Sequence, residues 1–302
     1  MKILVTGSNG LLGQKLTQLI QQQEGFELIA TARGKSAIPI TKGSFYSLDI
    51  CDPASVGSVF AEVKPDVVIH GAAMTMVDQC ETDRDACWKS NVTAVEYIVK
   101  ACEKINARLV HVSTDFIFDG SHGPLDENEK PAPVNFYGES KLTGEKVVME
   151  SSLDWCICRT VLVYGITSDM SRSNIVLWVK DSLEKGKTIQ VVNDQFRTPT
   201  LAEDLAMGCF LAAKHKAKGI YNISGKDFMS PYDIAIKTAE FFNLDKSLIK
   251  PADSTTFKQP ARRPLVTGFI IDKARKELGY EPHSFMEGVA LLAQQVASVS
   301  VK

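Results

Sequence analysis

The stretch Ile3-Leu4-Val5-Thr6-Gly7-Ser8-Asn9-Gly10-Leu11-Leu12-Gly13 decides the fold. A short apolar run leads into three glycines at G-x-x-G-x-x-G spacing, and an amphipathic run follows them. Glycine permits a tight turn and lets the backbone lie close to a pyrophosphate, and the helix start offers free N–H groups and a positive dipole end. The pattern predicts a strand, a phosphate loop and a helix that bind a dinucleotide, and the alternative is a glycine-rich turn without a ligand. The expected cofactor contacts here are Gly7, Asn9, Gly10, Leu11 and Gly13.

Strand-like and helix-like segments alternate through the first part of the chain. Short apolar or β-branched runs lie at Ile3–Thr6, Leu28–Ala32, Val67–His70, Leu109–Ser113 and Trp155–Arg159. Amphipathic stretches lie at Leu11–Gln23, Ala54–Val63, Cys87–Ile105 and Ser140–Glu150. This alternation predicts an α/β fold, a Rossmann-like doubly wound parallel sheet with a smaller C-terminal substrate-binding region. We expect the dinucleotide-binding domain over residues 1–160, rejoined by about 189–215, and the substrate-binding region over 161–188 and 216–302.

Composition excludes several classes of protein. The 302 residues carry 34 Lys+Arg and 36 Asp+Glu, a net charge of −2 that does not fit a strongly basic nucleic-acid binder. No apolar run reaches the roughly 18 residues of a membrane span, and the N-terminal apolar run is too short for a signal peptide. The seven cysteines are scattered and the five histidines do not cluster. We therefore expect a cytoplasmic protein with no metal site and with neither nucleic acid nor a membrane as partner.

The residue after the second expected strand bears on the choice of dinucleotide. An acidic side chain near Ala32 would hold the ribose 2′-OH of NAD, but the next residue is Arg33. A guanidinium can grip a 2′-phosphate. Arg33 therefore favours NADP(H), with NAD(H) left open, and the alternative is that Arg33 is a solvated loop cation.

Three residues form a catalytic pattern. Tyr137 and Lys141 have Y-x-x-x-K spacing, which places them on one face of a helix. A neighbouring cation lowers the pKa of a phenol, and a tyrosine so placed can protonate a carbonyl oxygen as hydride arrives. Thr114, at the end of a strand, can hydrogen-bond and polarise that carbonyl. Asn91 is expected either to orient Lys141 through water or to be a polar residue on a helix surface.

The glycine loop together with this trio resembles the extended branch of the short-chain dehydrogenase/reductase superfamily. Ser113-Thr114-Asp115-Phe116-Ile117-Phe118-Asp119-Gly120 is similar to the S-T-D-Y-V-F-D-G string of the dTDP-4-dehydrorhamnose reductases. Further similar segments are Pro133–Gly138, Arg159–Gly165, Asn193–Thr200 and Gly219–Gly225, so the resemblance covers almost the whole chain. It implies reduction, by NADPH, of the C4 keto group of a nucleotide-linked deoxysugar, as in dTDP-rhamnose biosynthesis.

The resemblance also implies roles for particular residues. Additional cofactor contacts are Asp49, Ile50, Ala72, Ala73 and Asn91, with Lys141 on the nicotinamide ribose and Tyr137 beside it. Substrate contacts are Thr114, Asp115, Phe116, Leu162, Arg197 and Arg262. A homodimer is common in similar proteins.

The chain departs from the family pattern at three positions. Leu162 stands where a Trp is common, Arg197 where a Gly is usual, and Gln14 where some members place a Mg²⁺-bridging Glu. Arg197 would either clamp the substrate diphosphate or cap a loop. Arg262 belongs either to a basic spot beside the substrate or to a surface basic pair.

Other functions remain open at this point. A sugar-nucleotide epimerase would use the same trio with tightly held NAD, and Arg33 argues against it. A dehydratase would carry an acid pair after the Thr, but Asp115 is followed by Phe116. A non-catalytic, NADP-binding regulatory subunit, similar to that of methionine adenosyltransferase, is an alternative of another class.

Overall fold

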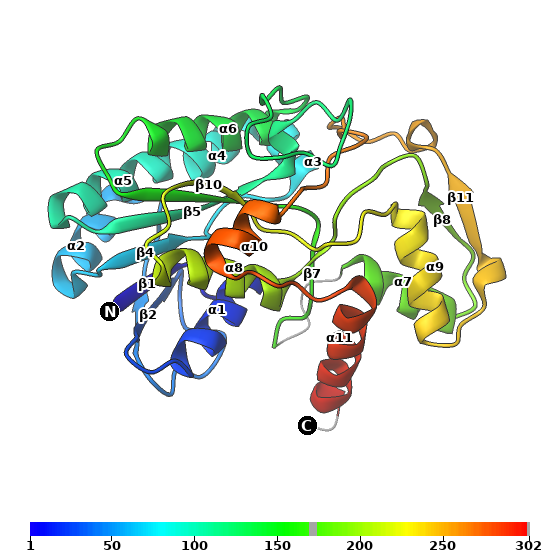
Figure 1. Ribbon diagram of the computed structural model, residues 1–302, viewed down its shortest axis with the longest axis horizontal. Helices are drawn as coiled ribbons and strands as arrows, with labels where there is room; N and C mark the ends of the chain where they lie inside the picture. Colours follow the sequence, from blue (N-terminus) through cyan, green and yellow to red (C-terminus); the bar gives the residue numbers. More distant parts are fainter. Residues whose placement is uncertain (169–173, 301–302) are drawn as a thin grey trace.

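A seven-stranded parallel sheet, with strand order β10-β6-β5-β4-β1-β2-β3, forms the centre of the computed structural model (Figure 1). The structure describes residues 1–168 and 174–300. The strands are β1 Lys2–Thr6, β2 Glu27–Ala32, β3 Ser44–Ser47, β4 Val67–His70, β5 Arg108–Thr114, β6 Trp155–Thr160 and β10 Gly219–Asn222. Each strand expected from the sequence lies within one of them. The predicted α/β fold with a doubly wound parallel sheet is confirmed.

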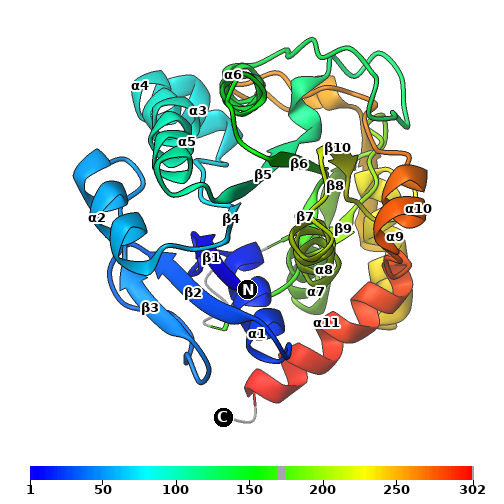
Figure 2. The same ribbon diagram turned by 60° about the vertical axis from the view of Figure 1, so that its left-hand side comes forward.

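Helices cover both faces of this sheet (Figure 2). On one face lie α1 Leu11–Gln21 and α8 Ala202–Lys214, and on the other lie α2 Pro53–Val63, α5 Ala94–Ile105 and α6 Phe136–Met149. Successive strand residues point to opposite faces, so in β1 Ile3 and Val5 pack in the first layer and Leu4 in the second. Burial on both sides explains why the strands are apolar almost without interruption.

The order of the strands fixes where a ligand can bind. From β1 the chain continues outward through β2 and β3, then crosses to β4 on the other side of β1. In such a sheet the crevice opens at the carboxyl ends of the strands where the direction reverses. The glycine loop, which follows β1, and the segment after β4 therefore lie at one edge with the end of β5.

Two predicted helices differ in detail from those observed. α6 begins at Phe136 rather than at Ser140, because the Asn135 side chain accepts the Gly138 N–H at 2.8 Å and caps the helix. The helix expected over Cys87–Ile105 is composite. It consists of α4 Arg84–Trp88, a π-helical turn Lys89–Thr93 and α5, and the short α3 Val77–Thr82 precedes it.

The smaller region contains α7 Ile175–Glu184, α9 Pro231–Phe241 and a two-stranded sheet of β8 Ile189–Val192 with β11 Ile249–Ala252. Around it lie β7 Val163–Tyr164 paired with β9 Thr200–Leu201, α11 Phe285–Ser300, and 3₁₀ turns at Lys246–Leu248 and Ser254–Thr256. α10 Asp272–Leu278 packs instead against α8 and β10, and the 3₁₀ turn Asp115–Ile117 packs against α6. The region has its own apolar clusters.

Two of the expected segment boundaries are corrected by strand pairing. Residues 189–192 were expected in the dinucleotide-binding domain, but β8 pairs with β11 in the small sheet. Residues 219–222 were expected in the substrate region, but β10 pairs with β6 in the central sheet. Pairing partners distant in sequence decide this placement, so local patterns could not reveal it.

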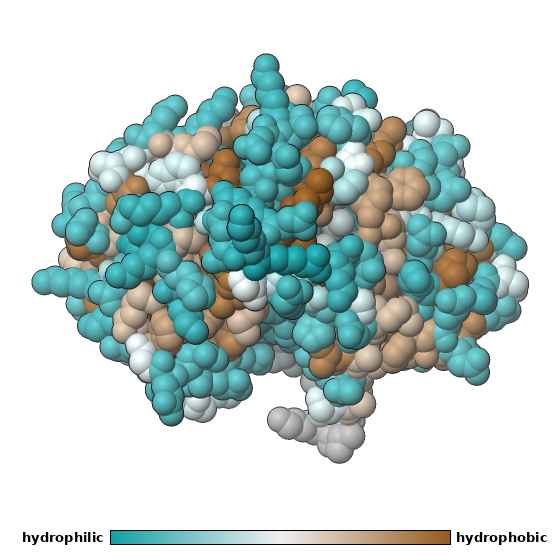
Figure 3. Space-filling view, viewed as in Figure 1, coloured by the Kyte–Doolittle hydropathy of each residue, from teal (hydrophilic) through white to brown (hydrophobic). Residues whose placement is uncertain are grey.

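The surface seen in Figure 3 is mostly hydrophilic, with hydrophobic residues in small separate patches. Within residues 1–168 and 174–300, none of the helices combines the length and apolar character that crossing a membrane requires.

Candidate active site

The glycine loop has the geometry of a phosphate cradle. Gly7 has a φ of +73°, and a Cβ at Gly13 would lie 2.1 Å from the Gly7 carbonyl oxygen. Helix α1 therefore packs directly on the loop, which any side chain at Gly13 would prevent. Gly10 is the N-cap of α1 and supplies no side-chain cap, so the first N–H groups of the helix, beginning at Leu11, are available to an anion.

Asn9 connects this loop to the segment after β2. Its side-chain amide donates to the Lys35 carbonyl at 2.8 Å and accepts the Ala37 N–H at 2.8 Å. Arg33 begins the same segment and is exposed. The structure thus brings Arg33 and the glycine loop to the same edge of the sheet, as a role on a 2′-phosphate requires.

Small residues after β4 allow the neighbouring backbones to approach. A Cβ at Gly7 would lie 3.0 Å from the Cα of Ala72, and the Ala72 N–H donates to Thr6 Oγ1 at 3.2 Å. Ala73 is half-buried beside it. Asp49 and Ile50 are half-buried after β3, where Asp49 Oδ1 accepts the Cys51 N–H at 2.9 Å.

The Y-x-x-x-K pair lies on the buried side of α6. Tyr137 is 7% exposed and Lys141 is 4% exposed. Lys141 Nζ donates to the Val112 carbonyl of β5 at 2.8 Å. A Cβ at Gly138 would lie 2.1 Å from the Phe116 carbonyl oxygen, so a glycine there lets the first turn of α6 pack against the 3₁₀ turn that follows β5.

The ionisation of this pair is governed by burial. Burial raises the pKa of Tyr137, and a hydrogen bond with Thr114 partly offsets that effect. Burial lowers the pKa of Lys141 to about 8, against the opposing attraction of Glu145. The phenol pKa is thus raised rather than lowered as the spacing to Lys141 predicts, because burial is the largest effect on it.

Asn91 is buried and makes several direct contacts with protein groups. It lies buried in the π-helical turn, where its amide donates to the Met74 carbonyl at 3.0 Å and to Ser140 Oγ at 3.0 Å and accepts the Met74 N–H at 2.9 Å. π-helical turns are frequent at functional sites. Asn91 thus fixes the segment after β4 to α6 through Ser140, and a water-mediated contact with Lys141 stays a prediction.

Two buried histidines complete the site, and the sequence reasoning did not single them out. Thr6 Oγ1 lies 2.8 Å from His70 Nδ1, the His70 and His111 rings are 5.4 Å apart between centroids, and His111 Nε2 lies 3.5 Å from Lys141 Nζ. Burial lowers the pKa of His70 to about 3 and also lowers the pKa of His111, so both rings are neutral. This series of contacts, from Thr6 through His70 and His111, connects the strand before the glycine loop to Lys141. Its sequence signal is a His at the same register position of two neighbouring strands.

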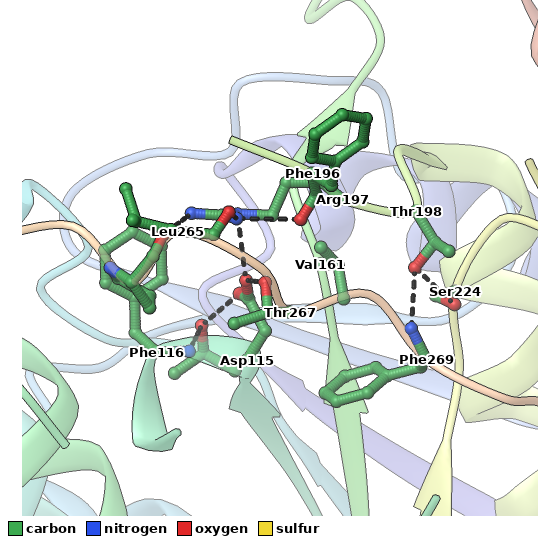
Figure 4. A network of polar contacts seen from close by, with 12 residues as sticks. Asp115, Phe116, Val161, Phe196, Arg197, Thr198, Ser224, Leu265, Thr267 and Phe269 are labelled. Atoms are coloured by element: carbon green, nitrogen blue, oxygen red, sulfur yellow. Dashed lines mark hydrogen bonds and ion pairs between the residues drawn. The ribbon is translucent and has the colours of Figure 1, made fainter. Parts of the chain in front are cut away.

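The residues expected to bind substrate divide into two groups. Phe116 is half-buried and its ring lies 5.5 Å from that of Tyr137, and Leu162 is 38% exposed between β6 and β7. Arg262 is exposed and lines a surface groove on the outer side of α6. Asp115 and Arg197 are instead buried, at 1% and 5% exposure. The expected diphosphate clamp is therefore corrected: Arg197 faces protein groups, and the loop-capping alternative describes it (Figure 4).

A comparison with protein-family models gives a match over residues 1–298 to the RmlD substrate binding domain. The chain belongs to the RmlD substrate-binding domain family. This places it in the extended short-chain dehydrogenase/reductase superfamily and confirms the resemblance to the dTDP-4-dehydrorhamnose reductases.

Individual relatives match most of the chain. A probable low-salt glycan biosynthesis reductase of Haloferax volcanii is 30% identical over 294 residues, 97% of each chain. Methionine adenosyltransferase 2 subunit beta of Pongo abelii is 30% identical over 255 residues, 83% of this chain and 75% of that protein. The structure of the Bacillus anthracis dTDP-4-dehydrorhamnose reductase in complex with NADP superimposes with a TM-score of 0.84 at 28% identity, covering 97% of this chain and 99% of that one.

Proposed function

We propose that this protein is an NADPH-dependent reductase of the C4 keto group of a nucleotide-linked deoxysugar, like the dTDP-4-dehydrorhamnose reductases. The observation that carries the proposal is the meeting of Thr114, Tyr137 and Lys141 at the edge of the sheet that also holds the glycine loop. A glycine loop alone is common to many dinucleotide-binding proteins, and the trio adds groups suited to proton transfer to a carbonyl oxygen.

The residues present fit a dinucleotide. The cradle leaves no room for a Cβ at Gly13, and the uncapped start of α1 suits a pyrophosphate. Arg33 would bind the 2′-phosphate of NADP, in keeping with the relative that was crystallised with NADP. The residues that would hold the remainder are Asn9, Asp49, Ile50, Ala72, Ala73 and Lys141. When bound, the dinucleotide supplies the hydride for C4.

The protein supplies the proton and the positioning. Because burial raises the pKa of Tyr137, its phenol is protonated at neutral pH and can donate to the oxygen on C4. Lys141, whose pKa is about 8, is mostly protonated at pH 7 and would hold the nicotinamide ribose. Thr114 would lie beside the keto group, next to Tyr137. Phe116 and Leu162 would contact the sugar nucleotide.

The test combines binding with turnover. The purified protein is titrated with NADPH and with NADH by fluorescence, and dTDP-4-dehydrorhamnose is then added while NADPH absorbance is followed. We expect NADPH to bind more tightly and to be oxidised, and Tyr137→Phe to retain binding but lose turnover by roughly a hundredfold or more. Tyr97→Phe, on α5 away from the site, is the matched control and should keep full activity. A Tyr137→Phe variant as active as the wild type would contradict the proposed proton donor.

A regulatory subunit is the second candidate, favoured by the similarity to methionine adenosyltransferase 2 subunit beta. It predicts NADPH binding without turnover and capture of a fixed partner protein. Preference for NADH, or NAD bound to the purified protein, would instead support an epimerase. Light scattering on the same sample would test the homodimer that is common in similar proteins.

A further inference from the structure

A buried ion pair joins the end of β5 to the loop before β9. Arg197 Nε lies 3.3 Å from Asp115 Oδ2, with both side chains inside the protein (Figure 4). Burying two charges is costly unless each is paired and hydrogen-bonded. The contacts of each partner therefore show what the pair does.

Arg197 is occupied by protein groups. Nη1 donates to the carbonyls of Phe196 and Leu265 at 2.8 Å each, and Nη2 donates to the Pro264 carbonyl. One planar guanidinium thus holds the 264–265 segment against the loop before β9. Its third nitrogen, Nε, faces the Asp115 carboxylate.

Asp115 directs the hydroxyl of Thr114. The carboxylate accepts the Thr267 hydroxyl at 2.5 Å on Oδ2 and the Thr114 hydroxyl at 3.1 Å on Oδ1. An ionised carboxylate can only accept hydrogen bonds, and a threonine has a single hydroxyl proton. With that proton on Asp115, Thr114 Oγ1 is left as an acceptor, and it receives the Phe116 N–H at 3.3 Å. Asp115 therefore sets the orientation of the Thr114 hydroxyl, which also interacts with the Tyr137 phenol.

The orientation of the Thr114 hydroxyl depends on the charge of Asp115. Burial raises the pKa of the Asp115 carboxyl, and Arg197, Thr267 and Thr114 oppose that effect. Among the described residues on the elements packed against Asp115, the titratable or charged groups that interact with it are Arg197 and Tyr137. A protonated Asp115 would be a donor itself and would free the Thr114 proton to turn toward Tyr137.

We propose that Arg197 is a positioning residue that keeps Asp115 ionised, so that Asp115 holds the Thr114 hydroxyl in one orientation beside Tyr137. This rests on the proposed reductase function, because it concerns the hydroxyl that lies beside the proposed proton donor. It also explains the arginine at position 197 without any contact between Arg197 and substrate.

The kinetic test is the pH profile of turnover. In Arg197→Met, Asp115 loses its cation and takes up a proton as pH falls. A rise of about three pKa units, within the range documented for buried carboxyls, would place this titration near neutrality. We expect kcat of this variant to fall roughly tenfold between pH 8 and pH 6, beyond any change in the wild type. Arg197→Lys, which keeps the charge, should retain the wild-type profile, and Arg197→Met/Asp115→Asn should lose the added pH dependence.

A stability measurement needs no substrate and separates this inference from the proposed function. A carboxyl whose pKa is raised on folding costs stability as pH rises through the interval between its unfolded and folded values. The unfolding free energy of Arg197→Met should therefore fall between pH 4.5 and pH 7 relative to Arg197→Met/Asp115→Asn. Should Arg197→Met not fold, Arg197→Gln takes its place in both measurements. Parallel stability curves, or a kcat profile that is lowered without changing shape, would overturn the proposal. A wild-type protein without turnover would contradict the reductase function, while the stability curves still decide the charge of Asp115.

Discussion

Replacing Lys141 with methionine should make the protein more stable at pH 7 while removing a residue of the proposed active site. The Lys141 side chain is 4% exposed, and burial lowers its pKa from 10.5 to about 8. At 1.36 kcal/mol per pKa unit, the ammonium form therefore costs the folded state about 3 kcal/mol. Methionine has a similar length and suits an apolar site. The hydrogen bond to the Val112 carbonyl is lost, at about 1 kcal/mol. The expected net gain is about 2 kcal/mol.

The pH dependence of the unfolding free energy tests this prediction. The pKa of Lys141 is lower in the folded than in the unfolded chain, so the cost is complete below pH 8 and disappears as pH rises toward 10.5. The wild type should therefore gain stability relative to Lys141→Met over that interval. Urea unfolding of both proteins at pH 7 and pH 10 measures the difference, with Lys100→Met, an exposed lysine of α5, as control. A variant that is less stable at pH 7, or a difference that stays constant between the two pH values, would refute the reasoning.

Three further predictions address the cradle, the buried core and the choice of dinucleotide. Gly13→Ala should weaken NADPH binding at least tenfold in a fluorescence titration, because its Cβ would lie 2.1 Å from a backbone oxygen. Gly57→Ala, in open space on α2, is the control; it should leave binding unchanged and raise the melting temperature. Equal effects of the two substitutions on binding would contradict the proposed phosphate cradle. Glu145→Gln should lower the unfolding free energy by about 3–5 kcal/mol, because it strips the buried Arg159 of a carboxylate bonded at 2.7 and 3.0 Å; a loss under about 1 kcal/mol in urea unfolding would show that Arg159 finds other partners. Arg33→Ser should lower the affinity for NADPH roughly tenfold and leave that for NADH unchanged, and equal losses for both dinucleotides would remove Arg33 from the 2′-phosphate site.

Local signals were sufficient for the central sheet. Apolar runs of strand length, separated by amphipathic stretches, predict parallel strands that are buried on both faces, and the strands formed where expected. Local signals failed for the smaller region. β8 and β10 are each four residues long, and nothing within four residues states which strand they will pair with.

The candidate site divides in the same way. Spacing alone identified Tyr137 and Lys141 as a pair, because i and i+4 share a helix face wherever the helix lies. It could not give their pKa values, which depend on the desolvation that other elements impose. The neighbouring cation alone predicts a lowered phenol pKa, but in the folded protein burial is the largest effect and raises it.

The sequence by itself determined the glycine cradle, the Tyr-Lys pair and the doubly wound sheet, because each is encoded by residues a few positions apart. The tertiary structure alone decided the partner of Arg197. The sequence allowed this guanidinium to face a diphosphate or to cap a loop, and the fold brings Asp115, 82 positions away, within 3.3 Å of it inside the protein. The physical reason is that a buried charge must find its counter-charge in three dimensions, and chain spacing carries no record of which residue that will be.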